Sequence, residues 1–318
     1  MRRRRGPAGR GGFALIAALW LLAAISMVAL DLSLRARDHR RSAANVQEAS
    51  VARGAAEAGV AHARALLERR LLMAARSADA GWADPWRGLD RLIPDSVRLS
   101  GSAYRVQLRD AGAALHLNRA GEDELRRLLQ ALRVDAGAAD RIAQAAADWR
   151  DADALRRPRG AERAEYLREG ASVLPSNQPF RAVAELRHVR GMTDEIFRRV
   201  SPYLTIRGSG QVNLSAAPRE VLLALPGMTE ESVALLLRMQ RAGTPLPSPA
   251  ELGGHLSPGA RSLYQRDLPR LMSRATTETR EVEIRSSGWV SGGRMRPVQE
   301  ALAVRAGTAV FLVDRGAP

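Results

Sequence analysis

The feature that most constrains this chain is an uncharged apolar run near its start. Residues 13–30 read FALIAALWLLAAISMVAL and directly follow the basic leader MRRRRGPAGRGG. A helix of that length rises about 27 Å, which nearly covers a bilayer hydrocarbon core of about 30 Å. Secretory signals have shorter apolar cores that end at a small-residue cleavage site, whereas this run continues as a helical pattern. The sequence therefore predicts an anchored protein rather than a freely exported one.

The flanks of the apolar run set the orientation of the predicted anchor. Five arginines precede the run and none lies within it, which places the N-terminus in the cytoplasm by the positive-inside rule. The arginines from Arg35 to Arg41 lie just beyond the run and argue against this orientation. We expect a single-pass protein with its N-terminus in the cytoplasm and its bulk outside.

Net charge and amino-acid composition exclude several classes of function for the rest of the chain. The formal net charge is +15, but all 49 basic residues are arginines, spread along the chain and often at helical spacing from acids. This pattern is typical of solvated helix faces. The absence of cysteine excludes a disulfide framework and a thiolate metal site. The five histidines are scattered and no G-x-S-x-G or Walker-type loop occurs, so we expect no enzyme.

Apolar periodicity divides the chain behind the anchor. Residues 31–78 predict an amphipathic continuation of the first helix, with an apolar face of Val46, Ala49, Ala52, Ala56, Val60, Ala63 and Leu67. Alternation predicts strands in 79–116 and two antiparallel strands in 275–318, and helical patterns fill 117–274. The sequence thus predicts an α+β fold in which a large helical domain is inserted between the strands of a small antiparallel sheet.

A weak internal repeat relates two parts of the helical region. Residues 117–132 and 212–228 share a hydrophobic residue, an asparagine, a short linker and a helix with an acid in its first turn. Asn118 and Asn213 precede these helices, where an asparagine side chain can hold the free N-terminal amides.

Two further segments predict matching helix hairpins. ELRHVRGMTDEIFRRV and VLLALPGMTEESVALLL each read as a helix, a Gly-Met-Thr turn and a second helix. Gly191 and Gly227 would end the first helices, and Thr193 and Thr229 would cap the second ones. These hairpins serve packing alone, or they form DNA-binding helix-hairpin-helix motifs. Only one glycine per turn is present where close approach to a phosphate needs two, which argues against nucleic acid.

A dense group of acids follows one helix of this region, in a stretch interrupted by prolines. The acids are Asp148, Asp151, Asp153 and Glu162. An irregular loop with several carboxylates suits calcium, which takes six to eight oxygen ligands. The same acids could instead cap a helix and pair with the neighbouring arginines, which are Arg150, Arg156 and Arg157.

Taken together, these segments resemble the type II secretion minor pseudopilin family GspK, general secretion pathway protein K. The resemblance covers almost the whole chain, and its most specific parts run from DWRDAD to GAE and from NQPF to ELRHVRGMT. The basic leader that ends in Gly12 and the apolar helix from Phe13 agree with it.

The resemblance implies a processing site at the start of the apolar helix. A prepilin peptidase would cleave between Gly12 and Phe13, and Phe13 would become the N-methylated first residue. Most pilin-like subunits carry a glutamate at the fifth mature position, which is Ala17 here, and family K members are similar in lacking this acid. A subunit without it avoids burying a carboxylate in the bilayer and can sit at a filament tip.

The resemblance also implies fold, role and location. The implied fold is a pilin-like long helix on a small sheet, with an inserted helical domain of two helix-hairpin-helix halves. The implied role is to cap the pseudopilus tip and nucleate its assembly, which helps to export folded proteins across the outer membrane.

The implied partners are minor pseudopilins of the I and J type, the major pseudopilin and the prepilin peptidase, with no nucleic acid. The chain would lie in the inner membrane with its C-terminal bulk in the periplasm. The alternative is a membrane-tethered DNA-uptake pilin that uses its helix hairpins.

The family also binds calcium, so the resemblance implies Ca²⁺ as a cofactor of the carboxylate group Asp148, Asp151, Asp153 and Glu162. This sequence departs from the family at Ala154, where relatives often have another acid or amide.

Overall fold

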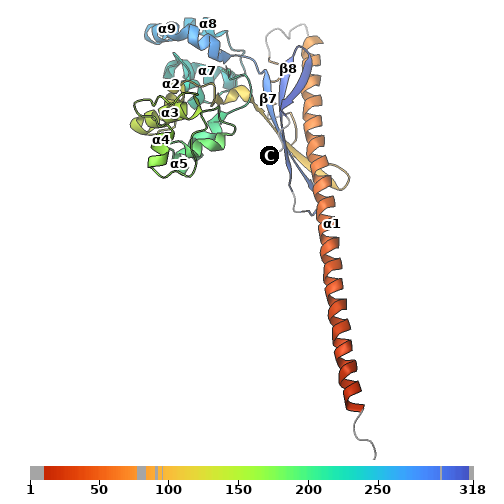
Figure 1. Ribbon diagram of the computed structural model, residues 1–318. Coiled ribbons are helices and arrows are strands. Elements are labelled where there is room, and N and C mark those ends of the chain that lie inside the picture. Colours follow the sequence, from red (N-terminus) through yellow and green to blue (C-terminus); the bar gives the residue numbers. More distant parts are fainter. Residues whose placement is uncertain (1–10, 77–83, 90–91, 95, 294–295, 315–318) are drawn as a thin grey trace, which may run out of the picture.

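The protein is described by a computed structural model at residues 11–76, 84–89, 92–94, 96–293 and 296–314. A long helix, α1 (Gly11–Arg76), carries an antiparallel sheet along one of its halves, and a block of shorter helices lies beside that sheet (Figure 1). The α+β class and the long first helix predicted from the sequence are confirmed.

The two halves of α1 differ in their surroundings. From Leu15 to Leu34 the side chains are exposed, and Figure 1 shows this part of α1 extending away from the rest of the molecule. The predicted apolar face becomes buried against the sheet only from Ala52 onward. Val46 is 67% exposed and Ala49 is half-buried, so the packed face begins one to two turns later than the pattern predicted.

In the part of the chain that the structure describes, the sheet has five antiparallel strands in the order β1-β2-β7-β8-β9. They are β1 (Val97–Arg98), β2 (Ser102–Asp110), β7 (Glu281–Val290), β8 (Val298–Ala306) and β9 (Ala309–Asp314). The sequence predicted two closing strands, and the structure adds β9 as a third. It was missed because only a two-residue turn separates it from β8, so the two strands read as one alternating run.

The helical block occupies the chain between β2 and β7. Its α-helices are α2 (Glu122–Ala131), α3 (Ala136–Arg150), α4 (Arg163–Arg168), α5 (Asp194–Val200), α6 (Arg219–Ala224), α7 (Glu230–Ala242), α8 (Pro249–Leu252) and α9 (Pro258–Arg274). Short 3-10 helices cover Ala111–Ala113, Val183–His188, Ser201–Tyr203 and Gly253–His255.

Each half of the block is closed by a short parallel strand pair. β3 (Leu115–His116) pairs with β4 (Leu204–Thr205), and β5 (Val212–Asn213) pairs with β6 (Ala275–Thr276). The repeat seen in the sequence therefore begins, in both halves, at a strand. The sequence predicted β3 and β6 as part of the sheet region. They pair instead with β4 and β5, inside the helical block.

The two helix hairpins form as predicted at their turns. Gly191 and Gly227 have positive φ angles of 85° and 70°, a backbone conformation that glycine adopts without strain. The Thr193 hydroxyl accepts a hydrogen bond from Ile196 N, and Thr229 does the same at the start of α7.

The two asparagines ahead of the repeated helices do not cap them, which corrects the prediction. Asn118 instead exchanges two hydrogen bonds with the backbone of Phe180, each at 2.8 Å. Asn213 donates to Asp110 across the junction between block and sheet. Both side chains bind segments distant in sequence, which spacing alone does not reveal.

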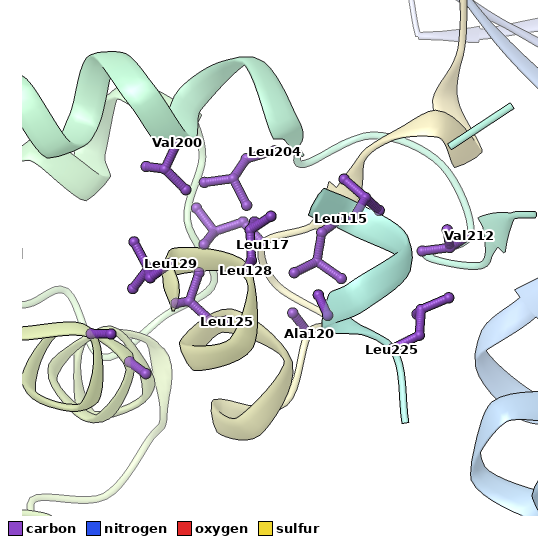
Figure 2. Packing of buried hydrophobic residues seen from close by; sticks show 14 of the residues in the cluster. Leu115, Leu117, Ala120, Leu125, Leu128, Leu129, Val200, Leu204, Val212 and Leu225 are labelled. Atoms are coloured by element: carbon purple, nitrogen blue, oxygen red, sulfur yellow. The ribbon is translucent and has the colours of Figure 1, made fainter. Parts of the chain in front are cut away.

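The described residues form two separate apolar cores. In the block, Leu125 and Leu128 of α2 lie around Leu117, and all three are buried (Figure 2). The other core lies between α1 and the sheet and includes Trp86, whose indole Nε1 donates to the carbonyl of Leu67 at 3.1 Å. The block therefore has a hydrophobic core of its own, and polar contacts hold it beside the sheet.

A buried hydrogen-bond group joins the two points where the chain crosses between sheet and block. Asp110, the last residue of β2, accepts from Asn213 Nδ2 at 2.6 Å and from Thr279 Oγ1 at 2.9 Å. The backbone N–H of Thr279 donates to Asp84 at 2.8 Å. Burial raises the pKa of Asp110, and its hydrogen-bond donors oppose that shift.

The segment between the two halves of the block lies against the sheet face opposite α1. The Thr205 hydroxyl donates to Glu283 at 2.6 Å, and the backbone N–H of Ser209 donates to Glu281 at 2.6 Å. Strand alternation turns both carboxylates away from the α1 core. Together with the Asp110 group, these bonds fix the position of the block beside the sheet.

Candidate functional site

The exposed half of α1 is the first candidate functional element. Among the described residues, one helix is long and apolar enough to cross a membrane; it includes Leu15–Arg76, and its most apolar window has a mean hydropathy of 2.3 with no residue buried. Leu, Ile and Trp side chains exposed without protein contact are costly in water and favourable in hydrocarbon. The helix therefore fits a single-pass membrane anchor.

The predicted processing site lies at the beginning of this helix. Gly12 and Phe13 belong to the first turn of α1, and the leader residues 1–10 lie outside the described residues. The fifth residue after the predicted cut, Ala17, is exposed.

The carboxylate loop, residues 148–162, is the second candidate site. Asp148, on the last turn of α3, is fully buried, and its carboxylate pairs with the Arg157 guanidinium at 2.6 Å. It also accepts from the backbone N–H of Arg157 at 3.2 Å. A Cβ on Gly160 would lie 2.0 Å from this carboxylate, so only glycine fits there. Asp148 thus holds the loop closed.

A different set of acids converges in the loop. Asp151, Asp153 and Glu162 each bring a carboxylate oxygen within 4.8 Å of the others. Asp148 is not among them, although the sequence prediction placed it in the ligand set. It was placed there because spacing shows which acids are near in sequence, but not which of them an arginine occupies.

Several oxygens of this acid cluster have no protein partner. Among the described residues, Asp151 Oδ1 and both carboxylate oxygens of Glu162 are buried without a hydrogen bond. Glu162 is only 5% exposed. Burial, followed by the charges of Asp148, Asp151 and Asp153, raises the pKa of Glu162. Buried, unpaired carboxylate oxygens need a cation or a proton.

The nearby arginines compensate only part of this charge. Arg157 Nη1 bonds Asp151 Oδ2 at 2.6 Å as well as Asp148. Arg150 turns away from the cluster and donates to the carbonyls of Leu117 and Ala120. Arg156 lies 3.9 Å from Glu165, outside the cluster. The predicted ion pairing is therefore realised for Asp148 and for one oxygen of Asp151, and it leaves Glu162 unpaired.

A hydrogen bond to the loop backbone and a surface hollow lie beside the cluster. Asn177, at a positive φ of 49°, donates through Nδ2 to the carbonyl of Asp153 at 2.7 Å. A hollow of about 530 Å³ opens beside Glu162 and is lined by Ala154, Leu167 and Pro175 among others. An all-oxygen donor set with an entry path fits a hard cation such as calcium.

Sequence reasoning missed the residues that join block and sheet. Asp110 and Thr279 form the hydrogen bonds of that junction, and neither residue belongs to a recognisable sequence motif. The one available signal was a polar residue at the end of each strand that borders the block, but that signal is common at strand ends.

Comparison with known proteins supports the resemblance seen in the sequence. The family model for type II secretion system (T2SS), protein K, matches residues 106–209. A type II secretion system protein K from Pseudomonas aeruginosa is 28% identical over 249 residues, covering 71% of this chain and 72% of that protein. One from Aeromonas hydrophila is 26% identical over 245 residues, covering 71% and 73%.

The fold also has a solved counterpart. A chain in the crystal structure of the GspK-GspI-GspJ complex from the enterotoxigenic Escherichia coli type 2 secretion system superposes with a TM-score of 0.62. The match covers 87% of this chain and 99% of that one at 19% identity.

An apolar helix with an antiparallel sheet on one half and a helical block inserted between two strands is the α+β fold that this chain shares with the solved chain, and the exposed half of the helix fits a single-pass membrane anchor. The chain is therefore similar to type II secretion system protein K, in its sequence and in its fold.

Proposed function

We propose that this protein is a minor pseudopilin of a type II secretion system that caps the pseudopilus tip and nucleates its assembly. The observation that carries the proposal is the shape of the molecule. One half of α1 is bare and apolar, and the inserted block enlarges the opposite end of the molecule (Figure 1). The bare half suits helix packing inside a filament, and the bulky end suits a position with no subunit beyond it.

The comparisons with known proteins support the choice of partners. The relatives are protein K components, and the structural counterpart was crystallised in a complex with GspI and GspJ. We assign I-type and J-type minor pseudopilins as direct neighbours, followed by the major pseudopilin and the prepilin peptidase. The role is structural and not enzymatic, in the inner membrane, with the N-terminus in the cytoplasm and the block in the periplasm.

Co-purification from detergent-solubilised membranes tests this role. A tagged full chain should retain the I-type and J-type pseudopilins, and a tagged single-pass protein of unrelated fold serves as control. Retention of neither pseudopilin would overturn the proposal. Salt-sensitive binding of DNA by the purified chain would instead support the DNA-uptake alternative.

We further propose that Asp151, Asp153 and Glu162 hold a calcium ion. The ion would supply positive charge to buried oxygens that lack a partner, and it would join the end of α3 to the start of α4. Backbone carbonyls and water would complete a shell of six to eight oxygens. Asp148 stays outside the set and keeps the loop closed through Arg157.

Thermal unfolding of the full chain with calcium and with EGTA tests this proposal. Binding to the folded state alone stabilises it by about 2.7 kcal/mol at a hundredfold excess over Kd. Glu162→Gln should abolish the calcium-dependent shift, while Glu169→Gln, which changes a carboxylate that pairs with Arg190 outside the cluster, should leave it intact. An unchanged melting curve with and without calcium would leave these acids metal-free.

A further inference from the structure

The helix α1 has a bare charged segment between its apolar half and the sheet. We call residues 31–51 the stalk. Its side chains are exposed except for the half-buried Glu48 and Ala49 at its end, which lies next to the sheet, and Figure 1 shows the preceding part of the stalk extending away from the sheet. Asp31 and Arg35 pair with each other at 2.8 Å, one helical turn apart. The remaining arginines of this segment are Arg37, Arg40 and Arg41.

These three arginines share one helix face. Residues three and four apart are neighbours on an α-helix, so Arg40 and Arg41 both lie beside Arg37, and like charges at this spacing repel. Within the described part of the chain, no carboxylate lies within ion-pair distance of any of the three. Such a face is stabilised by an external anion.

The arginines lie at a defined distance from the apolar run. If Phe13 marks one edge of a hydrocarbon core of about 30 Å, the core ends near Leu32. Arg37 to Arg41 then follow roughly 8 to 14 Å further along the helix, and a long arginine side chain reaches back toward the headgroup layer. The guanidinium groups thus meet lipid phosphates, with which they form paired hydrogen bonds.

We propose that Arg37, Arg40 and Arg41 bind the phosphate groups of anionic phospholipids on the side of the membrane that faces the folded body. This inference rests on the proposed membrane anchor and adds a lipid partner to it. The contacts hold the subunit upright in the bilayer before assembly. They also explain why arginines occur on the non-cytoplasmic side of the anchor, where the positive-inside rule disfavours them. Pulling the subunit into a filament must break these contacts.

Lipid retention by the full chain tests the proposal. The chain is reconstituted in vesicles of equal parts phosphatidylcholine and phosphatidylglycerol, extracted in mild detergent at low salt, and its bound lipid is measured by mass spectrometry. We expect an excess of phosphatidylglycerol that falls about fivefold for each arginine removed, since one surface arginine contributes about 1 kcal/mol toward an anionic membrane. The excess should also fall with added salt.

The decisive comparison uses two triple variants. Arg37→Gln/Arg40→Gln/Arg41→Gln should lose the excess of phosphatidylglycerol. A control with the same charge change further along α1, Arg53→Gln/Arg69→Gln/Arg76→Gln, should keep it. The leader arginines are common to both variants and cancel in the comparison.

Equal lipid retention by both variants would overturn the proposal, whether or not the anchor itself is correct. Loss of binding to partner pseudopilins in the first variant, with lipid retention unchanged, would assign the arginines to a protein contact instead. Failure of the whole chain to enter vesicles would contradict the membrane anchor, a distinct result.

Discussion

Gly288→Ala is the substitution that most severely tests the contact between α1 and the sheet. A Cβ at this position of β7 would lie 2.1 Å from the carbonyl oxygen of Ala52 and 2.4 Å from the backbone nitrogen of Ala56. Both are backbone atoms of α1, so no side-chain rotation relieves the clash. The helix and the strand would have to separate locally by about 1 Å, which forfeits a quarter to a half of the dispersion energy of the atoms facing the gap.

The expected cost is about 3 kcal/mol, the upper end for overpacking, because the obstructing atoms are backbone. Urea unfolding of the purified full chain in detergent, followed through tryptophan fluorescence, to which the buried Trp86 contributes, measures it. Gly54→Ala is the matched control. Its added Cβ meets nothing within 4 Å, and alanine in a helix interior should stabilise the chain by about 1 kcal/mol. A Gly288→Ala chain as stable as the unchanged one would refute this close packing.

Three further predictions concern the processing site and the carboxylate loop. Gly12→Leu should leave an unprocessed precursor in membranes, whereas mass spectrometry of the unchanged protein should show an N-methylated Phe13; an intact leader in the latter would contradict the assignment. Asp148→Asn should destabilise the chain by about 3 kcal/mol both in calcium and in EGTA. This is the lower end of the range for a broken buried ion pair, because the Arg157 side chain is 35% exposed. Destabilisation seen only in calcium would return Asp148 to the ligand set. Calcium affinity should fall as the pH is lowered from neutral through the raised pKa of Glu162, because the ion needs the carboxylate. Without calcium, the raised pKa means that Glu162 stabilises the fold at low pH, and this contribution is lost as the pH rises through that pKa. Because calcium binding needs the deprotonated carboxylate, calorimetry should detect proton release when calcium binds. Affinity independent of pH would exclude Glu162 as a ligand.

The long helix, the inserted block and its hairpin turns could all be predicted from the sequence, because local patterns encode them. The apolar run, the threonine caps at Thr193 and Thr229 and the glycines at Gly191 and Gly227 act over a few residues, and the structure realises each of them. The two-residue strands β4 and β5 left no periodic signal of their own.

The candidate site could be predicted only in part, because its final form depends on which side chains meet after folding. The sequence located the acid cluster, but it could not show that Arg157 binds Asp148 and thereby leaves Glu162 unpaired. Likewise, Asn118 and Asn213 occupy positions typical of helix caps, yet each bonds a segment more than 60 residues away.

Site-specific cross-linking in cells tests the tip position most directly, and the chain is suited to it because it contains no cysteine. Ser33→Cys places a thiol on the exposed half of α1, and Arg266→Cys places one on α9, at the far end of the block, where Arg266 is 70% exposed. A tip subunit predicts cross-links from Ser33→Cys to the other minor pseudopilins and none to any pseudopilin from Arg266→Cys. Cross-links from Arg266→Cys to the major pseudopilin would place a subunit beyond the block and contradict the account.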